Sequence, residues 1–383
     1  MEPASLLPEG SGGGDAAEFG ILRPELLVTF ADGAIVLTDA GSRRSFKVTG
    51  QTLSVLAAAA DTSGVERKTL EGRYGTAAVH EALWQLAHAG LMSTEPGADA
   101  GLPWRDWGPC TWQFHQLSSD VRYMLTREEI DAAAERRACT PPPPISKCGC
   151  AEHLTTGLPQ PRGTLGPPLS EVLLARRTCR AFTGAPITVQ QLADVLFYTG
   201  GWLHREHVPH VGPVFKKCVP SPGARHTIEI YPIVNGCRDV EPGVYHYCVE
   251  HHRLVRISDR DPQQLADAAL LQQTYFSQAP VVFLLTCIPE RLMWKYKTPR
   301  AYRHAHLEAG HYCQNLVLTA TALGLGAFQT GAIADTEIQE RLGIDGHSEF
   351  AIYAAGVGHR CAAEPADWTV EISPRLAELG TIG

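Results

Sequence analysis

Residues 294–311, with the sequence WKYKTPRAYRHAHLEAGH, place an amine beside a phenol just before a long amphipathic segment. The amine is Lys295 and the phenol is Tyr296. A phenol has a pKa of about 10, so it is a weak base at neutral pH unless a neighbouring cation stabilises its anion. An adjacent ammonium group can do this, which makes the pair a candidate proton-transfer unit. A Lys–Tyr dipeptide by itself is more often a solvent-exposed turn, so the other motifs of the chain decide its meaning.

A basic segment comes earlier in the chain. After an apolar stretch at 173–175, which predicts a helix, the sequence continues with Arg176, Arg177, Thr178 and Arg180. Guanidinium groups are forked donors that match phosphate oxygens, and a hydroxyl at this spacing adds another donor. The segment therefore predicts either an anion-binding site or a basic surface patch.

Three glycine-containing passages complete the set of motifs. PSPGARH at 220–226 opens onto a strand-like run, LGLGAFQTG at 323–331 ends the long helix, and AGVGHR at 355–360 ends an apolar strand. Glycine has no side chain, so backbone donors in such passages can approach a ligand closely. Each passage is weak evidence by itself, whereas their order along the chain is specific.

In this order the motifs resemble the SagB-type dehydrogenases, the FMN-dependent azoline oxidases of the nitroreductase superfamily. The resemblance covers roughly residues 166–362, and the Lys–Tyr pair separates this branch from ordinary nitroreductases, which lack it. It implies an α+β fold with a central, mostly antiparallel sheet flanked by helices. It also implies a homodimer, because the flavin sites of this superfamily lie between subunits.

The resemblance implies roles for individual residues. Lys295 and Tyr296 match the catalytic pair, with Tyr296 as the base and the opposite assignment also open. The segment 176–180 would hold the phosphate and ribityl chain, while the loop at 221–225 would reach the flavin ring from the partner subunit. The residues assigned to FMN are Arg176, Arg177, Thr178, Arg180, Ser221, Arg225, Thr330, Gly331 and Arg360.

The implied reaction oxidises a thiazoline or oxazoline ring of a peptide to a thiazole or oxazole. FMN accepts the electrons, and oxygen is the expected reoxidant because no nicotinamide-binding glycine fingerprint follows a strand. The expected partners are an azoline-containing peptide, a second copy of the chain and a cyclodehydratase complex. Three alternatives stay open: an NAD(P)H-dependent nitroreductase acting on small molecules, a non-catalytic scaffold subunit of a cyclodehydratase complex, and an oxidase whose substrate is bound to a carrier protein.

Composition narrows the class of protein. The 383 residues are 44% apolar and 19% charged, which is typical of a globular chain with room for a core. A net charge of −8 argues against nucleic acid as the main partner. We see no apolar run long enough for a membrane span and no signal peptide, so a cytoplasmic location with reduced cysteines is expected.

The chain is expected to divide at a proline-rich middle. Residues 1–20 are predicted to be a flexible leader, and 21–97 a winged-helix-like domain with strands at 27–30, 35–37 and 45–48 and helices at 51–60 and 77–89. Residues 98–165 form a Trp/Pro-rich connector, and 166–383 form the dehydrogenase domain. The N-terminal domain is expected either to recognise a leader peptide by strand addition or only to pack on the catalytic half.

Within the connector, four side chains have the chemistry of zinc ligands. They are Cys139, Cys148, Cys150 and His153. Their spacing differs from the usual Cys-x-x-Cys knuckle, so free surface thiols are the favoured interpretation and no metal site is predicted.

One face of the long helix carries polar residues at intervals of four, three and four. These are His304, Glu308, His311 and Asn315. We expect this face to line a substrate or flavin site or a subunit interface.

Overall fold

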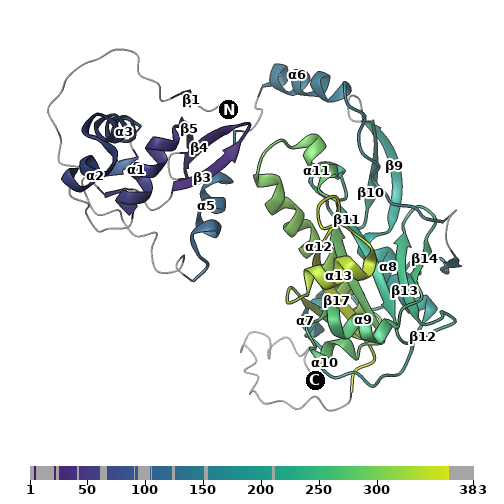
Figure 1. The fold of residues 1–383 in the computed structure, drawn as a ribbon. Helices are drawn as coiled ribbons and strands as arrows, with labels where there is room; N and C mark the ends of the chain where they lie inside the picture. Colours follow the sequence, from purple (N-terminus) through teal and green to yellow (C-terminus); the bar gives the residue numbers. More distant parts are fainter. Residues whose placement is uncertain are drawn as a thin grey trace, which may run out of the picture. The chain divides into compact units, whose positions relative to one another are not determined.

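The computed structural model describes residues 4–5, 21–22, 26–40, 43–60, 67–89, 91–93, 104, 106–122, 126–150, 154–208 and 212–361 (Figure 1). Contacts divide the chain into two units, Met1–Arg122 and Tyr123–Gly383, which are described separately. Of the predicted leader, only Ala4–Ser5 (β1) lie within the described residues, where they pair in parallel with β5. His153 lies outside the described residues.

The N-terminal unit is a small sheet followed by helices. Asp32 and Gly33 both have positive φ, at 50° and 71°, which matches the tight hairpin that an Asp-Gly pair favours. Leu37, Phe46 and Leu86 are buried in the core between sheet and helices. The predicted strands and helices are confirmed within a few residues, and α2 was not predicted. The elements are β2 (Ile21–Leu22), β3 (Leu26–Ala31), β4 (Ala34–Asp39), β5 (Arg44–Val48), α1 (Gly50–Ala60), α2 (Arg67–Tyr74), α3 (Thr76–His88), β6 (Met92–Ser93) and α5 (Pro109–Leu117).

The C-terminal unit is built on a seven-stranded sheet in the order β16-β17-β15-β11-β13-β14-β7. Every pairing in this sheet is antiparallel, so the predicted α+β class with a central antiparallel sheet is confirmed. The strands are β7 (Thr155–Gly157), β11 (Ile228–Val234), β13 (Gly243–Cys248), β14 (Arg253–Ser258), β15 (Val281–Cys287), β16 (Gly326–Thr330) and β17 (Phe350–Gly358). Two short pairs lie outside it: β8 (Ile187–Thr188) with β12 (Cys237–Arg238), and β9 (Trp202–Val208) with β10 (Gly212–Lys217).

Helices cover both faces of this sheet. Side chains alternate along a strand, so Phe283 of β15 packs with the cluster of α8 and α12, while Leu284 packs with that of α9, α10 and α13. No helix among the described residues is long and apolar enough to cross a membrane. The helices are α6 (Arg127–Ala138), α7 (Leu169–Ala175), α8 (Val189–Gly200), the short η1 (Pro222–Ala224), α9 (Pro262–Ala269), α10 (Thr274–Ser277), α11 (Glu290–Lys295), α12 (Arg300–Ala322) and α13 (Asp335–Leu342).

The predicted connector is shared between the two units. Its α5 belongs to the N-terminal unit, whereas α6 and β7 belong to the C-terminal unit. β7 pairs with β14 and forms one edge of the large sheet. Residues 139–150, which follow α6, therefore belong to the C-terminal unit.

Replacing Gly356 with alanine tests the packing of this sheet. A Cβ atom at Gly356 would overlap the Phe328 ring, so Gly356→Ala should lower the free energy of unfolding by about 1–3 kcal/mol. Thermal unfolding measures this change. Gly163→Ala is the matched control, because its Cβ would meet no atom within 4 Å, and it should change stability by no more than about 0.5 kcal/mol. Equal stability of the two variants would contradict the packing described here.

Candidate functional site

The Lys–Tyr pair lies at the end of α11. Lys295 is the last residue of this helix, and the Tyr296 amide still donates to the Leu292 carbonyl oxygen at 2.7 Å. Both side chains are half-buried. The Lys295 Nζ atom lies 5.6 Å from the centre of the Tyr296 ring. The backbone turn at the helix end thus presents an amine and a phenol side by side.

The PSPGARH loop lies directly against this pair. Its Gly223 has φ 63°, and a Cβ atom there would lie 2.7 Å from Lys295 Nζ and 2.8 Å from the Tyr296 hydroxyl. The Ser221 hydroxyl accepts a hydrogen bond from the His226 amide at 2.8 Å, which holds the loop closed. Glycine is therefore required at 223 both for its conformation and for the close approach. Two motifs that are about seventy residues apart in sequence meet here.

Arg225 of the same loop is buried under Trp294. Its guanidinium lies 4.8 Å from the Trp294 ring centre and donates to the carbonyl oxygens of Arg291 and Pro143, both at 3.1 Å. In this chain, the side chain thus holds α11 and the connector in place. Its assignment to the flavin ring stays a prediction.

A second buried arginine, Arg291, holds the same region together. It donates to the carbonyl oxygens of Pro144 at 2.8 Å and His226 at 2.7 Å. Its third contact is an ion pair with Glu229 at 2.6 Å, and Glu229 also accepts from His246 at 2.8 Å. Burial opposes the charge on Glu229, but the nearby Arg291 and His246 lower its pKa to about 2. Sequence reasoning missed Arg291, because an arginine at the start of a short helix has no distinguishing local pattern.

The surroundings of the pair disfavour charge on both members. Burial lowers the pKa of Lys295, and the cations of Arg137 and Arg225 lower it further. Burial raises the pKa of Tyr296, and Arg137 partly opposes that rise. Both shifts therefore oppose formation of an ammonium–phenolate ion pair. A raised phenol pKa disfavours Tyr296 as an anionic base, and the roles of the two residues stay predictions.

The polar face of α12 is turned largely inward. Glu308 is fully buried and accepts from the Thr227 amide at 3.1 Å and from its hydroxyl at 2.8 Å. Asn315 donates to the carbonyl oxygens of Tyr198 and Cys218. His304 packs edge-on against the Tyr296 ring, 6.0 Å between centres, whereas His311 is exposed. One end of this face thus reaches the Lys–Tyr pair, and its middle supports the loop that covers the pair.

The basic segment lies at another place on the sheet. Thr178 forms a parallel bridge with Ala327 of β16, and Phe182 an antiparallel bridge with Arg360. A Cβ atom at Gly326 would lie 2.7 Å from the Arg360 Cγ atom, so this glycine permits the close approach. Tertiary structure thus gathers the segment 176–182, the start of β16 and the end of β17, which together contain four of the arginines assigned to the cofactor. Several guanidinium groups and one hydroxyl fit a phosphate-bearing cofactor.

The remaining two residues assigned to the cofactor lie at the far end of β16. Thr330 closes this strand, where its hydroxyl accepts from the Ala332 amide at 3.1 Å. Gly331 is exposed beside the Tyr353 ring. The basic segment contacts the start of β16, whereas Thr330 and Gly331 lie at its other end. That other end is nearer to the Lys–Tyr pair.

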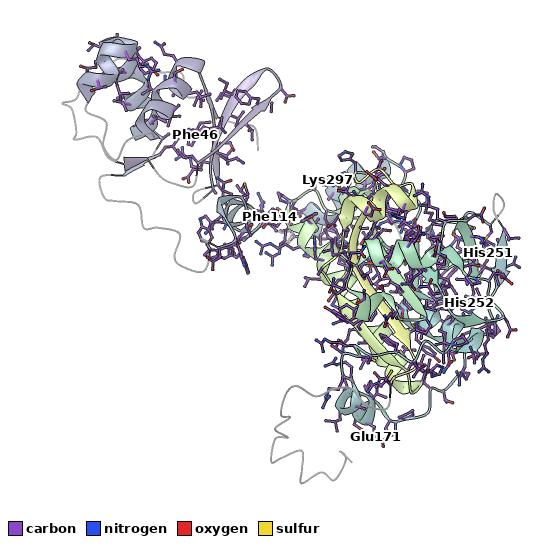
Figure 2. The ribbon with its side chains drawn as sticks, turned by 60° about the horizontal axis from the view of Figure 1, so that its bottom comes forward. Phe46, Phe114, Glu171, His251, His252 and Lys297 are labelled. Carbon is purple, nitrogen blue, oxygen red and sulfur yellow. The ribbon has the colours of Figure 1, made fainter. Side chains whose placement is uncertain are left out.

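Within one chain the two groups of motifs lie at opposite ends of the sheet. Registers align Gly326 with Gly358 and Val357 with Val281 at one end, while Cys287 of β15 pairs with Ile228 at the other, just before α11. A seven-residue strand such as β15 spans about 20 Å. Figures 1 and 2 agree: α7 and its Glu171 lie at one end of the unit, and α11 and Lys297 at the other.

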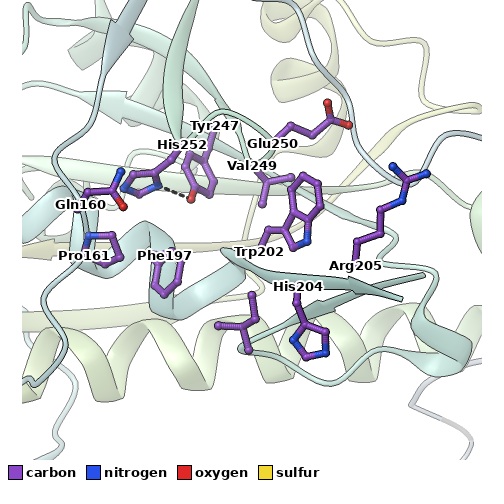
Figure 3. Close-up of a pocket in the computed structure, with 11 residues that line it drawn as sticks. Gln160, Pro161, Phe197, Trp202, His204, Arg205, Tyr247, Val249, Glu250 and His252 are labelled. Carbon is purple, nitrogen blue, oxygen red and sulfur yellow. Dashed lines mark hydrogen bonds between the residues drawn. The ribbon is translucent and has the colours of Figure 1, made fainter. Parts of the chain in front are cut away.

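A pocket of about 320 Å³ lies between α8, the start of β9 and the turn after β13 (Figure 3). One wall is Phe197 and Trp202, and another is the turn after β13, where the Tyr247 hydroxyl bonds to His252 at 2.8 Å. None of the residues assigned to catalysis or cofactor binding lines it. We therefore place the candidate site at the motif-bearing ends of the sheet and not in this pocket.

The environment of Lys295 can be tested directly. Because the Arg137 cation lowers the pKa of Lys295, Arg137→Gln should raise it toward the ordinary value of about 10.4. Reductive methylation with ¹³C-formaldehyde labels the lysine amines, and an NMR titration then measures their pKa values. The signal that is missing from Lys295→Arg belongs to Lys295. An unchanged pKa in Arg137→Gln would contradict the electrostatic contact.

Comparison with known proteins gives the family. The model of the nitroreductase family matches residues 173–359. MJ1384 of Methanocaldococcus jannaschii, which bears the name of a nitroreductase, is 36% identical over 192 residues, covering 50% of this chain and 91% of that protein. The trifolitoxin-processing protein TfxB of Rhizobium leguminosarum bv. trifolii is 37% identical over 153 residues, but this chain spans only 41% of its length. A crystal structure described as a nitroreductase of Ralstonia eutropha has a TM-score of 0.46 and 22% identity, covering 57% of this chain and 94% of that one. The protein belongs to the nitroreductase family.

Proposed function

We propose that this nitroreductase-family protein is an FMN-dependent oxidase of thiazoline or oxazoline rings in a modified peptide. The observation that carries the proposal is the Lys295–Tyr296 pair, half-buried beneath the Gly223 loop and beside Arg137. The Tyr296 ring packs against the hydrophobic core, while the helix end and the loop are held by backbone and arginine contacts, so the two polar groups of the pair are available for chemistry. The name of TfxB, a relative that processes trifolitoxin, supports a role in maturation of a natural product.

The cofactor-holding residues would be the basic segment and its neighbours on β16 and β17. In this proposal Arg176, Thr178 and Arg360 donate hydrogen bonds to the FMN phosphate. Thr330 and Gly331 border the flavin ring. When bound, FMN supplies the acceptor for the hydride that leaves the substrate.

Residues of the chain would remove the proton from the substrate. Aromatisation of an azoline removes one proton from Cα and one hydride from the neighbouring ring carbon. The Cα proton is acidified by the adjacent C=N and carbonyl groups, so a neutral amine is a sufficient base. Lys295 takes this proton, while Tyr296 donates a hydrogen bond that orients the ring. The Gly223 loop and His304 shield the pair from bulk water.

We further propose that two copies of the chain build each site. The basic segment and the Lys–Tyr pair of one chain lie at opposite ends of its sheet, so a partner copy would supply the missing half. The outward side of α12 offers an interface, because Leu307 is 60% exposed there and Gly310 leaves room for close approach. A homodimer with twofold symmetry would give two equivalent sites.

The N-terminal unit would recognise the peptide before oxidation. β3 is an edge strand of its sheet, and its Phe30 is 76% exposed. An extended peptide can add to such an edge through backbone hydrogen bonds, with side chains supplying selectivity. The alternative, a unit that only packs on the catalytic half, remains open, as does association with a cyclodehydratase.

The roles of the catalytic pair predict unequal losses of activity. With a thiazoline-containing peptide and air, the native protein should remove two hydrogen atoms per ring, as measured by mass spectrometry. Lys295→Ala should lower the rate by about 10²–10⁴-fold because it removes the base, and added small amines should restore part of it. Tyr296→Phe should lower it about tenfold or less, since it removes one hydrogen bond.

The same experiment separates the proposal from its alternatives. A larger loss in Tyr296→Phe than in Lys295→Ala would reverse the roles of the two residues. Rapid bleaching of the flavin by NADH, with no change in the peptide, would instead indicate a conventional reductase. A conventional nitroreductase is the main alternative function, because the archaeal relative that this chain covers to 91% bears the name of a nitroreductase.

The two-copy site predicts complementation between inactive variants. Arg176→Glu and Lys295→Ala damage different halves, so heterodimers formed by coexpression contain one intact site. Random pairing should then restore about one quarter of the native activity. Coexpression of Lys295→Ala with Tyr296→Phe is the control, because both changes lie in the same half, and its activity should not exceed the average of the two variants. Absence of recovery in the first pair would place the whole site within one chain.

A further inference from the structure

Four potential metal ligands converge where the connector meets the end of β13 and the turn after it. Cys148 and Cys150 come from the connector, and Cys248 and His251 come from the end of β13 and the turn after it. Their ligand atoms all lie within 4.8 Å of one another. Figure 2 shows His251 at the surface of the unit, apart from both Lys297 and Glu171. The cluster thus joins segments about one hundred residues apart in sequence.

The distances match the edges of a tetrahedron around one ion. A zinc ion with Zn–S bonds of about 2.3 Å and Zn–N bonds of about 2.0–2.1 Å sets its sulfurs about 3.8 Å apart and sulfur and nitrogen about 3.6 Å apart. The Cys148 and Cys248 sulfurs are 3.4 Å apart. His251 Nδ1 lies 3.5 Å from the first sulfur and 3.4 Å from the second. The His251 nitrogen is thus almost equally far from the two sulfurs, and the Cys150 thiol lies beside them. This arrangement fits four ligands around a single metal ion.

We propose that Cys148, Cys150, Cys248 and His251 form a structural zinc site that fastens the connector to the β13–β14 turn. Three thiolates and one imidazole fill all four positions, which is typical of structural and not catalytic zinc. From the sequence, free surface thiols were favoured over a zinc site made of Cys139, Cys148, Cys150 and His153. Of these, Cys148 and Cys150 belong to the cluster and Cys139 does not. Cys139 caps the end of α6, with its thiol directed at the Glu135 carbonyl oxygen.

A disulfide between Cys148 and Cys248 is the main competing explanation. It would leave Cys150 without a partner and would give His251 no role between the two sulfurs. The neighbouring contacts also favour a fixed loop: Lys147 donates to the Tyr231 hydroxyl at 2.7 Å and to Glu349 at 2.8 Å, and the Ser146 hydroxyl bonds to Glu250. A preformed loop lowers the entropy cost of gathering four ligands.

The site has a consequence for the catalytic end. The segment that leads to Cys148 carries the Pro143 and Pro144 carbonyl oxygens that receive Arg225 and Arg291. Zinc would therefore fix one end of residues 143–150, the segment whose carbonyl oxygens bind these two arginines. This inference concerns the fold of the chain and holds whether or not the proposed oxidase activity is correct.

Zinc content of the purified, full-length, reduced protein tests the site. Elemental analysis should find one zinc per chain in the native protein and in Cys139→Ser, the control for an exposed cysteine outside the cluster. Cys148→Ser and His251→Ala, which change exposed ligands, should lose stoichiometric zinc, whereas His251→Cys should retain it as a four-thiolate site. Cobalt added to metal-free protein should give the visible absorption of a tetrahedral thiolate centre. Chelation should increase hydrogen exchange in residues 140–150.

Three results would overturn the inference. The first is native protein that, after zinc supplementation and reduction, neither contains nor binds stoichiometric zinc. The second is zinc content unchanged in both Cys148→Ser and His251→Ala. The third is a Cys148–Cys248 disulfide found by peptide mapping of protein purified without reductant.

Discussion

Burial of two arginines beside each other is the constraint on which the Lys–Tyr end of the C-terminal unit depends. Arg291 is almost completely removed from solvent, and Arg225 completely so. Such charges are tolerated only when ion pairs and hydrogen bonds replace water, because a buried charge left without a partner costs several kcal/mol. Here the partners are Glu229 and carbonyl oxygens of the connector, of α11 and of His226. These contacts tie the loop, the helix and the connector to one another.

The chemistry of the Lys–Tyr pair follows from this arrangement. Arg137 and Arg225 contribute positive charge near Lys295, and the Gly223 loop lies against both members of the pair, which are half-buried. In that environment the amine is more readily neutral than in water, and the phenol is less readily ionised. The directions of both pKa shifts therefore follow from burial and from the neighbouring cations. The buried Glu308 contributes through the Thr227 backbone and hydroxyl, which support the same loop.

Much of the fold was readable from local sequence. The Asp32-Gly33 hairpin, helices α1 and α3 of the N-terminal unit and the long helix before Leu323 follow from turn chemistry and apolar periodicity, which act over a few residues. The ordered motifs also predicted the α+β fold with its antiparallel sheet and the family. Less was readable in the middle of the chain, because α5 and β7 are short and obtain their stability from the unit each one joins.

The sequence by itself determined which chemical groups this protein can offer: an amine beside a phenol, a run of guanidinium groups, and glycines where backbone must come close. Only the tertiary structure decided which of them meet. It brought the Gly223 loop to Lys295, separated the basic segment from that pair by the length of the sheet, and exchanged Cys139 for Cys248 in the cysteine cluster. The physical reason is that strand register and the pairing of buried charges act between residues distant in sequence, where spacing along the chain carries no information about distance in space.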